Sequence, residues 1–204
     1  MLAGQSCLSY QAILAAIVLF LAPVYCGGQY RPVPRDRGTE YIMPPEVYAH
    51  YKNRRGPKGQ GSCVWASCAM AGGHHDVREA EALLRDPNFG DGAWPGRVEQ
   101  EFQRRGIPAW NIEGSESIKW IEWALKTGRH VPITYGTAHM ICAVGLSPDR
   151  QTFYLVDNNY PAEVRAVSRD VFLREHRGFA GGWAIVLKTQ GPPPWVPPPG
   201  GPIR

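Results

Sequence analysis

The pattern of hydrophobic and polar positions divides the chain into a helical half followed by a half made of strands. Helices are predicted over residues 63–70, 77–85, 95–105 and 116–127, and the last has an apolar face formed by Ile118, Trp120, Ile121 and Leu125. Short apolar runs predict strands over residues 131–135, 139–146, 152–157, 163–167 and 182–188. Helices followed by an antiparallel sheet are the order of an α+β fold.

Most of the predicted helices have, at their N-terminus, a residue that is suited to the start of a helix. Ser62, Asp76 and Ser115 each stand where a side chain can cap the first turn of a helix. Pro95 suits the first position of the third helix, because its missing N–H is not needed there. Ser168 is expected to cap a further short helix over residues 170–175.

Glycines and one turn mark where elements end. Gly72 with Gly73, Gly106 and Gly128 are expected to end the first, third and fourth helices. Residues 147–150 (SPDR) predict a hairpin turn between the second and third strands. The hairpin makes these two strands antiparallel neighbours.

Composition divides the chain into four parts. Residues 1–27 are expected to form a signal peptide or N-terminal anchor, residues 28–45 an extended leader, and residues 46–190 the folded domain. Residues 191–204 form a proline-rich tail that favours polyproline II and is a candidate contact for a partner protein. With 204 residues and 44% apolar composition, the chain can bury one substantial core.

The first thirty residues carry no charged side chain, and residues 12–25 are almost wholly apolar. That run is short for a bilayer span but has the length of the apolar core of a signal peptide. We therefore expect a cleaved export signal and a secreted or periplasmic protein. The alternative is an uncleaved segment that anchors the protein to a membrane.

The net charge of +4 is too small to indicate a nucleic-acid partner. Four cations, Lys52, Arg54, Arg55 and Lys58, nevertheless cluster just before Cys63. They are interpreted first as a solvated loop. The alternative is that they lower the pKa of a nearby thiol or attract acidic groups.

The cysteines indicate a free thiol rather than a disulfide scaffold. Of five in the chain, two precede residue 28 and are expected to leave with the signal. The remaining three, Cys63, Cys68 and Cys142, are odd in number for an exported protein. Cys68 and Cys142 are predicted to lie in the core.

Cys63 is the candidate nucleophile, because it follows a Gly-Ser pair at the mouth of the most apolar helix. A helix N-terminus and a neighbouring imidazolium both favour the thiolate, the form of cysteine that attacks. His139, at the start of a buried strand, is the candidate base. The hairpin turn brings His139 opposite residues 157–159, so Asp157 or Asn158 can orient the ring. Because successive side chains of a strand point to opposite faces, only one of these two can face the His139 ring.

No metal or cofactor is expected. His74 and His75 are interpreted as a surface turn. Together with Cys63 and Cys68 they imitate a zinc set, but they lack a second well-spaced pair of ligands.

The chain resembles papain-like cysteine peptidases, including their bacteriocin-processing branch. The resemblance rests on residues 60–66 (QGSCVWA), 139–145 (HMICAVG) and 158–160 (NNY). It implies a papain-like fold in which the nucleophile helix packs on the antiparallel sheet, with Asn158 orienting His139. The bacteriocin-processing branch uses aspartate, which keeps Asp157 open. Gln60 would help to bind the oxyanion, although it stands only three residues before Cys63, nearer than the glutamine of the family.

The resulting hypothesis is an exported thiol hydrolase that cleaves a peptide or amide bond through an acyl-enzyme on Cys63. Its substrate would be a peptide or protein. A cell-wall peptide amidase or transpeptidase uses the same groups. A catalytically silent papain-like binding module is the alternative from another class.

Overall fold

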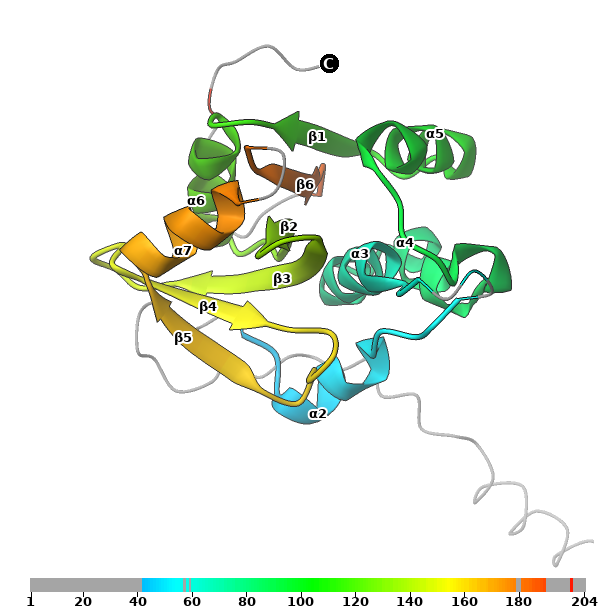
Figure 1. Cartoon of the computed structure of the whole chain (residues 1–204), viewed down its shortest axis with the longest axis horizontal. Coiled ribbons are helices and arrows are strands. Elements are labelled where there is room, and N and C mark those ends of the chain that lie inside the picture. Colours follow the sequence, from blue (N-terminus) through cyan, green and yellow to red (C-terminus); the bar gives the residue numbers. More distant parts are fainter. Residues whose placement is uncertain (1–41, 57, 59, 179–180, 190–198, 200–204) are drawn as a thin grey trace, which may run out of the picture. The chain divides into compact units, whose positions relative to one another are not determined.

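The structure, a computed structural model, describes residues 42–56, 58, 60–178, 181–189 and 199 (Figure 1). The predicted signal or anchor over residues 1–27 lies outside the described residues. So do the leader up to residue 41 and the proline-rich tail apart from residue 199.

The described residues form an α+β fold, as the order of the elements predicted. Its α-helices are α2 (Pro45–Tyr48), α3 (Cys63–His74), α4 (Arg78–Ala82), α5 (Pro95–Arg105), α6 (Ser117–Lys126) and α7 (Arg169–Arg177). Its strands are β1 (Ala109–Glu113), β2 (Val131–Tyr135), β3 (His139–Leu146), β4 (Thr152–Val156), β5 (Val164–Ser168) and β6 (Trp183–Leu187). Short 3₁₀ turns cover Ala49–Tyr51, Leu83–Arg85 and Pro87–Phe89.

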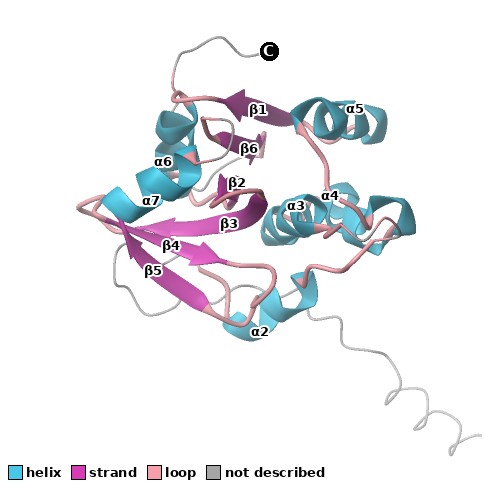
Figure 2. Ribbon diagram, in the orientation of Figure 1, coloured by secondary structure: helices cyan, strands magenta, loops and turns pink. Residues whose placement is uncertain are grey.

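The strands form one antiparallel sheet in the order β1-β6-β2-β3-β4-β5 (Figure 2). The hairpin of β2 and β3 pairs Val131 with Ala143 and Tyr135 with His139. Strands β3 and β4 pair around the predicted turn, with a β-bulge between Ala143 and Gly145. A bulge adds one residue to one strand and shifts the register beyond it.

Helices cover both faces of this sheet. Helices α6 and α7 lie over one face, and α3, α4 and α5 lie over the other (Figure 1). Side chains of β3 alternate accordingly: Met140 and Cys142 pack toward α3, whereas Ile141 and Ala143 pack toward α6. Because both faces are buried, β3 is apolar along nearly its whole length.

Helix α3 is the central helix of the fold. Residues 64–72 are all buried, so the helix is enclosed by protein on every side. It contacts β2 and β3 of the sheet and is packed against α4. This burial fixes the position of its first residue, Cys63.

The predicted end of α3 at Gly72 and Gly73 is wrong, because the helix continues through both to His74. These glycines serve close packing. A Cβ on Gly72 would lie 2.7 Å from the Cβ of Ala80, and one on Gly73 would lie 1.8 Å from the hydroxyl of Tyr51. The glycine at the end of α5, Gly106, does adopt the left-handed conformation expected of a helix stop.

Three predicted caps are not formed. The hydroxyl of Ser62 is used by the preceding loop, Asp76 adopts a left-handed turn conformation, and α6 begins two residues after Ser115. Ser168 does cap α7, accepting a hydrogen bond from the N–H of Val171.

Two elements were not predicted. Strand β1 (Ala109–Glu113) is an edge strand that pairs only with β6 within the described part of the chain. Helix α2 follows Met43, which is buried and donates its backbone N–H to the hydroxyl of Tyr48. None of the described helices has the length and apolar character needed to cross a membrane.

Candidate active site

Cys63 is the first residue of α3, and its side chain is only partly buried. The N–H groups in the first turn of a helix have no acceptors within the helix, so this position favours a negative charge. Cys68 and Cys142 are fully buried, and burial raises the pKa of both thiols. Cys63 is therefore the candidate nucleophile among the three cysteines of the folded domain.

His139 begins β3, and Asp157 directly follows β4, so the β3–β4 hairpin brings the two side chains together. Nε2 of His139 lies 2.8 Å from Oδ1 of Asp157 and donates to it. The imidazole is also hydrogen-bonded to the thiol of Cys63.

The surroundings of this pair favour its charged form. Burial alone would raise the pKa of Cys63, but hydrogen bonds from His139 and from the backbone N–H groups of Met140 and Val64 outweigh it and lower that pKa. Burial alone would lower the pKa of His139, but hydrogen bonds with Asp157 and Cys63 raise it to about 9. The same contacts therefore favour a thiolate on Cys63 beside an imidazolium on His139.

Asp157 is held as a carboxylate. Burial works against its charge, but hydrogen bonds from His139 and from the backbone N–H of Asn159, which lies 2.9 Å from Oδ1, lower its pKa. The side chain of Asn159 accepts a hydrogen bond from Asn53 at 2.8 Å, which ties this turn to the loop before α3. No role was predicted for Asn159, which was named only within residues 157–159 opposite His139.

Asn158 does not contact the imidazole, so the role that the resemblance implied for it falls to Asp157. Its fully buried Nδ2 lies 2.8 Å from the carbonyl oxygen of Met140, 2.9 Å from Oγ of Ser67 and 3.0 Å from the carbonyl oxygen of Cys63. These contacts join the first turns of α3 to the start of β3. Asn158 therefore fixes the distance between the elements that carry Cys63 and His139.

Gln60 lies at the exposed mouth of the site. Its backbone carbonyl accepts a hydrogen bond from Gly56, and its side chain lines the same cavity as Cys63. The structure thus brings Gln60, Cys63, His139 and Asp157 to one place.

A cavity of about 330 Å³ opens beside Cys63 and His139. Its apolar lining includes Val64, Met140 and Trp183. Another wall is formed by Gly92 and Ala93, whose side chains are small or absent. Nothing in the sequence marked this last wall, because Gly92 and Ala93 belong to a loop far from the other motifs. A larger cavity of about 420 Å³ between α5 and β6 has no cysteine, histidine or serine in its lining.

His74 and His75, which were predicted in a surface turn, are partly buried instead. The ring of His74 stacks on that of His130 at 3.5 Å between centroids, and Nε2 of His74 donates to the carbonyl of Gly128. The ring of His75 packs edge-on against His74. Across the described ranges of the chain, no group of three or more His, Cys, Asp or Glu side chains is arranged to hold a metal ion.

A scan against models of known protein families and a search of curated proteins both found no match for this chain. The geometry of the site itself indicates what chemistry it could perform. That geometry offers a thiol whose pKa is lowered, an imidazole held by a carboxylate, and a cavity beside them. These are the groups needed for nucleophilic attack on a carbonyl carbon and for protonation of the group that leaves.

Proposed function

We propose that this chain is a papain-like thiol hydrolase that cleaves peptide or amide bonds. The observation that carries the proposal is the chain of hydrogen bonds from Cys63 through His139 to Asp157 at the edge of an open cavity. Structural cysteines are usually inert and buried, as Cys68 and Cys142 are, and they are not activated in this way.

In the first half of the reaction, the Cys63 thiolate attacks the carbonyl carbon. The C–N bond of the tetrahedral intermediate breaks, and the departing amine takes a proton from the imidazolium of His139. In the second half, neutral His139 accepts a proton from water as that water attacks the thioester. The C–S bond breaks, the acid product leaves, and the thiolate–imidazolium pair is restored.

The oxyanion of the intermediate needs hydrogen-bond donors on the side of the cavity near α3. The backbone N–H of Cys63 is one candidate, because the first residue of a helix has no acceptor for it within the helix. The side-chain amide of Gln60, which lines the cavity, is the second. Export to the cell exterior or periplasm remains part of the proposal and depends on residues 1–27.

The first test is the rate of alkylation by iodoacetamide against pH. A free thiol with a pKa of about 8.5 is only about 1% thiolate at pH 6.5. We expect Cys63 to react at least about tenfold faster than a free thiol at that pH, and His139→Ala to remove the advantage. Cys63→Ala should abolish the fast labelling at pH 6.5, whereas Cys68→Ala, which removes a buried thiol, should leave it intact.

The second test is turnover of a fluorogenic peptide library by the same proteins. Hydrolysis that is lost in Cys63→Ala and retained in Cys68→Ala would support the proposal. Labelling that rises only near pH 8.5 and ignores His139 would overturn it, and a binding module on the same fold would then be the better explanation.

A further inference from the structure

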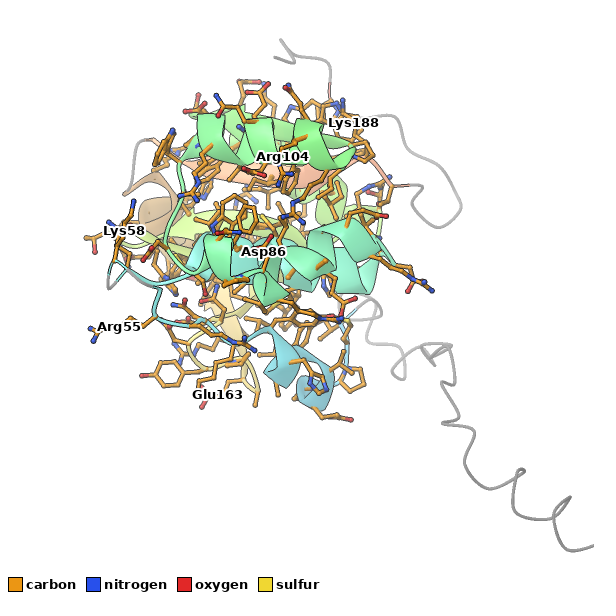
Figure 3. All side chains as sticks on the ribbon, turned by 90° about the vertical axis from the view of Figure 1, so that its right-hand side faces the viewer. Arg55, Lys58, Asp86, Arg104, Glu163 and Lys188 are labelled. Atoms are coloured by element: carbon orange, nitrogen blue, oxygen red, sulfur yellow. The ribbon has the colours of Figure 1, made fainter. Side chains whose placement is uncertain are left out.

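Four cations stand together at the entrance to the candidate active site. Lys52, Arg54, Arg55 and Lys58, called the basic rim below, all have exposed side chains. Gln60 and Gly61, a few residues further on, line the cavity beside Cys63. Figure 3 shows the labelled Arg55 and Lys58 projecting outward on the same side of the fold.

The segment that carries these cations is fixed by backbone contacts. Arg55 and Gly61 form an antiparallel bridge, and the N–H of Gly56 donates to the carbonyl of Gln60 at 2.7 Å. The carbonyl of Arg54 accepts from the N–H of Ser62 at 2.8 Å. The backbone of Arg54 and Arg55 is therefore held beside the start of the nucleophile helix.

The same segment is docked against both walls of the site. Gly56 packs so closely on Gly90 that a Cβ there would lie 2.2 Å from the carbonyl carbon of Gly90. The backbone N–H of Lys58 donates to the carboxylate of Asp91, next to the cavity wall at Gly92. On the other side, the N–H of Asn53 donates to the carbonyl of Asn158.

The basic rim differs from many surface cations of this protein in having no acidic partner. Seven other lysines and arginines form ion pairs, which are Arg85, Arg104, Arg105, Lys119, Arg165, Arg169 and Arg174. Within the described residues, none of the four rim cations does so. The sequence from residue 47 to residue 75 also contains no aspartate or glutamate.

We propose that the basic rim binds carboxylates of the substrate, so that the substrate is an acidic peptide segment with aspartate or glutamate near the bond to be cleaved. This inference rests on the proposed function and names its substrate class. Unpaired cations at the mouth of a cleft attract an anionic ligand and hold it where the cavity receives its neighbouring residues. A peptide is favoured over other polyanions because the rim adjoins the cavity that would receive a peptide bond.

The binding test uses Cys63→Ala, which cannot form an acyl-enzyme, and three fluorescein-labelled peptides of one length. All share an Ala-Leu-Gly-Ala centre and carry four Glu, four Gln or four Lys around it. Single exposed ion pairs change affinity only a few-fold, so we expect the rim as a whole to favour the Glu peptide over the Gln peptide by about tenfold at low salt. The preference should shrink as salt is raised, because salt screens exposed charges.

The variant Arg55→Gln/Lys58→Gln, made in the same background, should lose most of the preference for the Glu peptide. The matched control is Arg78→Gln/Lys126→Gln, which removes two exposed cations outside the rim, at the first residue of α4 and the last residue of α6. It lowers the net charge by the same amount and should keep the preference. Equal binding of all three peptides, or equal loss in both double variants, would overturn the proposal.

Turnover of the same peptides by the wild-type protein separates this proposal from the proposed function. Cleavage without a preference for Glu would leave the hydrolase standing and overturn the basic rim as a specificity device. Rim-dependent binding of the Glu peptide without any cleavage would support the rim and count against hydrolysis. The protein's affinity for phosphatidylglycerol vesicles is measured alongside. Tighter binding to the vesicles than to the Glu peptide would indicate that the rim binds a lipid surface, and would overturn the proposal of an acidic peptide substrate.

Discussion

Asp157 shares a face of the β3–β4 hairpin with His139 and lies 2.8 Å from its Nε2, whereas the next residue, Asn158, points the other way into α3. The bulge in β3 decides this arrangement. Near the turn, Leu146 pairs with Phe153, and that register would put Asn158 on the face of His139. Beyond the bulge, Cys142 pairs with Val156, and this register puts Asp157 on the same face as His139. One inserted residue thus selects a carboxylate rather than an amide as the partner of the base.

The first prediction concerns that carboxylate. Asp157→Asn removes the negative charge that helps to raise the pKa of His139 to about 9. A group with a raised pKa keeps its proton up to that value, so the activity of the wild-type protein should decline as pH rises through about 9. In the variant the decline should begin at lower pH, and kcat/KM at pH 8 should fall about 10²-fold.

The pH dependence of kcat/KM for peptide hydrolysis checks this expectation. The matched control is Asp149→Asn in the exposed β3–β4 turn, which should leave the profile unchanged. If kcat/KM of Asp157→Asn still declines only near pH 9, the carboxylate does not set the pKa of His139.

The second prediction concerns the amide of Asn158. Asn158→Asp replaces the Nδ2 donor with an oxygen that faces two carbonyl oxygens, those of Met140 and Cys63. The variant must leave acceptors unpaired or bury a proton, and we expect a loss of about 3 kcal/mol in the free energy of unfolding. Urea denaturation measures this loss.

Gln100→Ala, on the exposed side of α5, is the control and should change the stability by less than about 0.5 kcal/mol. If Asn158→Asp proves as stable as this control, the amide does not hold α3 to β3. The rate of Cys63 alkylation should fall in Asn158→Asp under conditions where the variant is folded, because the thiol would no longer be held against His139.

The third prediction concerns the glycines in α3. Alanine normally stabilises a helix interior by about 1 kcal/mol relative to glycine. At Gly72 the new methyl group would meet Ala80 and the backbone of Glu81 at less than 3 Å, so Gly72→Ala should destabilise the protein by about 2 kcal/mol. Gly96→Ala in the first turn of α5, where the nearest atoms are 3.9 Å away, should be neutral or stabilising.

Thermal unfolding of the two variants tests the packing role of Gly72. A glycine inside a helix with no close neighbour would tolerate alanine at Gly72 as well as at Gly96. Equal melting temperatures for the two variants would therefore contradict the close approach of α4.

Much of the fold could be predicted because the sheet is covered on both faces. Buried strands appear in the sequence as short apolar runs, and β2 and β3 were predicted to the residue. Edge strand β1 is only partly buried and contains Asn111 and Glu113, so its pattern is weak. The glycines of α3 misled the prediction because their role depends on α4 and Tyr51, which local sequence does not reveal.

The site could be predicted only as far as local signals extend. Cys63 and His139 each stand at the start of an element that the sequence shows clearly. The choice between Asp157 and Asn158 depends on the bulge in β3. Gly145 inside the strand is a signal that could have indicated a bulge, but it does not by itself fix the register. The wall at Gly92 and Ala93 depends on how a loop packs on Gly56, which is a tertiary contact.

The fourth prediction concerns acid stability. Burial, followed by the charges of His74 and Arg129, lowers the pKa of His75 to about 3, and burial lowers the pKa of His74 as well. An unfolded histidine takes up a proton near pH 6.5, so below that pH the unfolded state binds more protons and the folded state loses stability as pH falls. Above pH 6.5 the effect is absent.

Between pH 7 and pH 5, His75 alone should cost on the order of 2 kcal/mol of folding free energy. His75→Phe, which keeps an aromatic ring against His74 but cannot be protonated, should reduce the loss without abolishing it, because His74 still contributes. His50→Gln at an exposed position is the control. Unfolding in urea at the two pH values measures the difference. An equal loss in wild type and His75→Phe would show that acid sensitivity arises elsewhere in the protein.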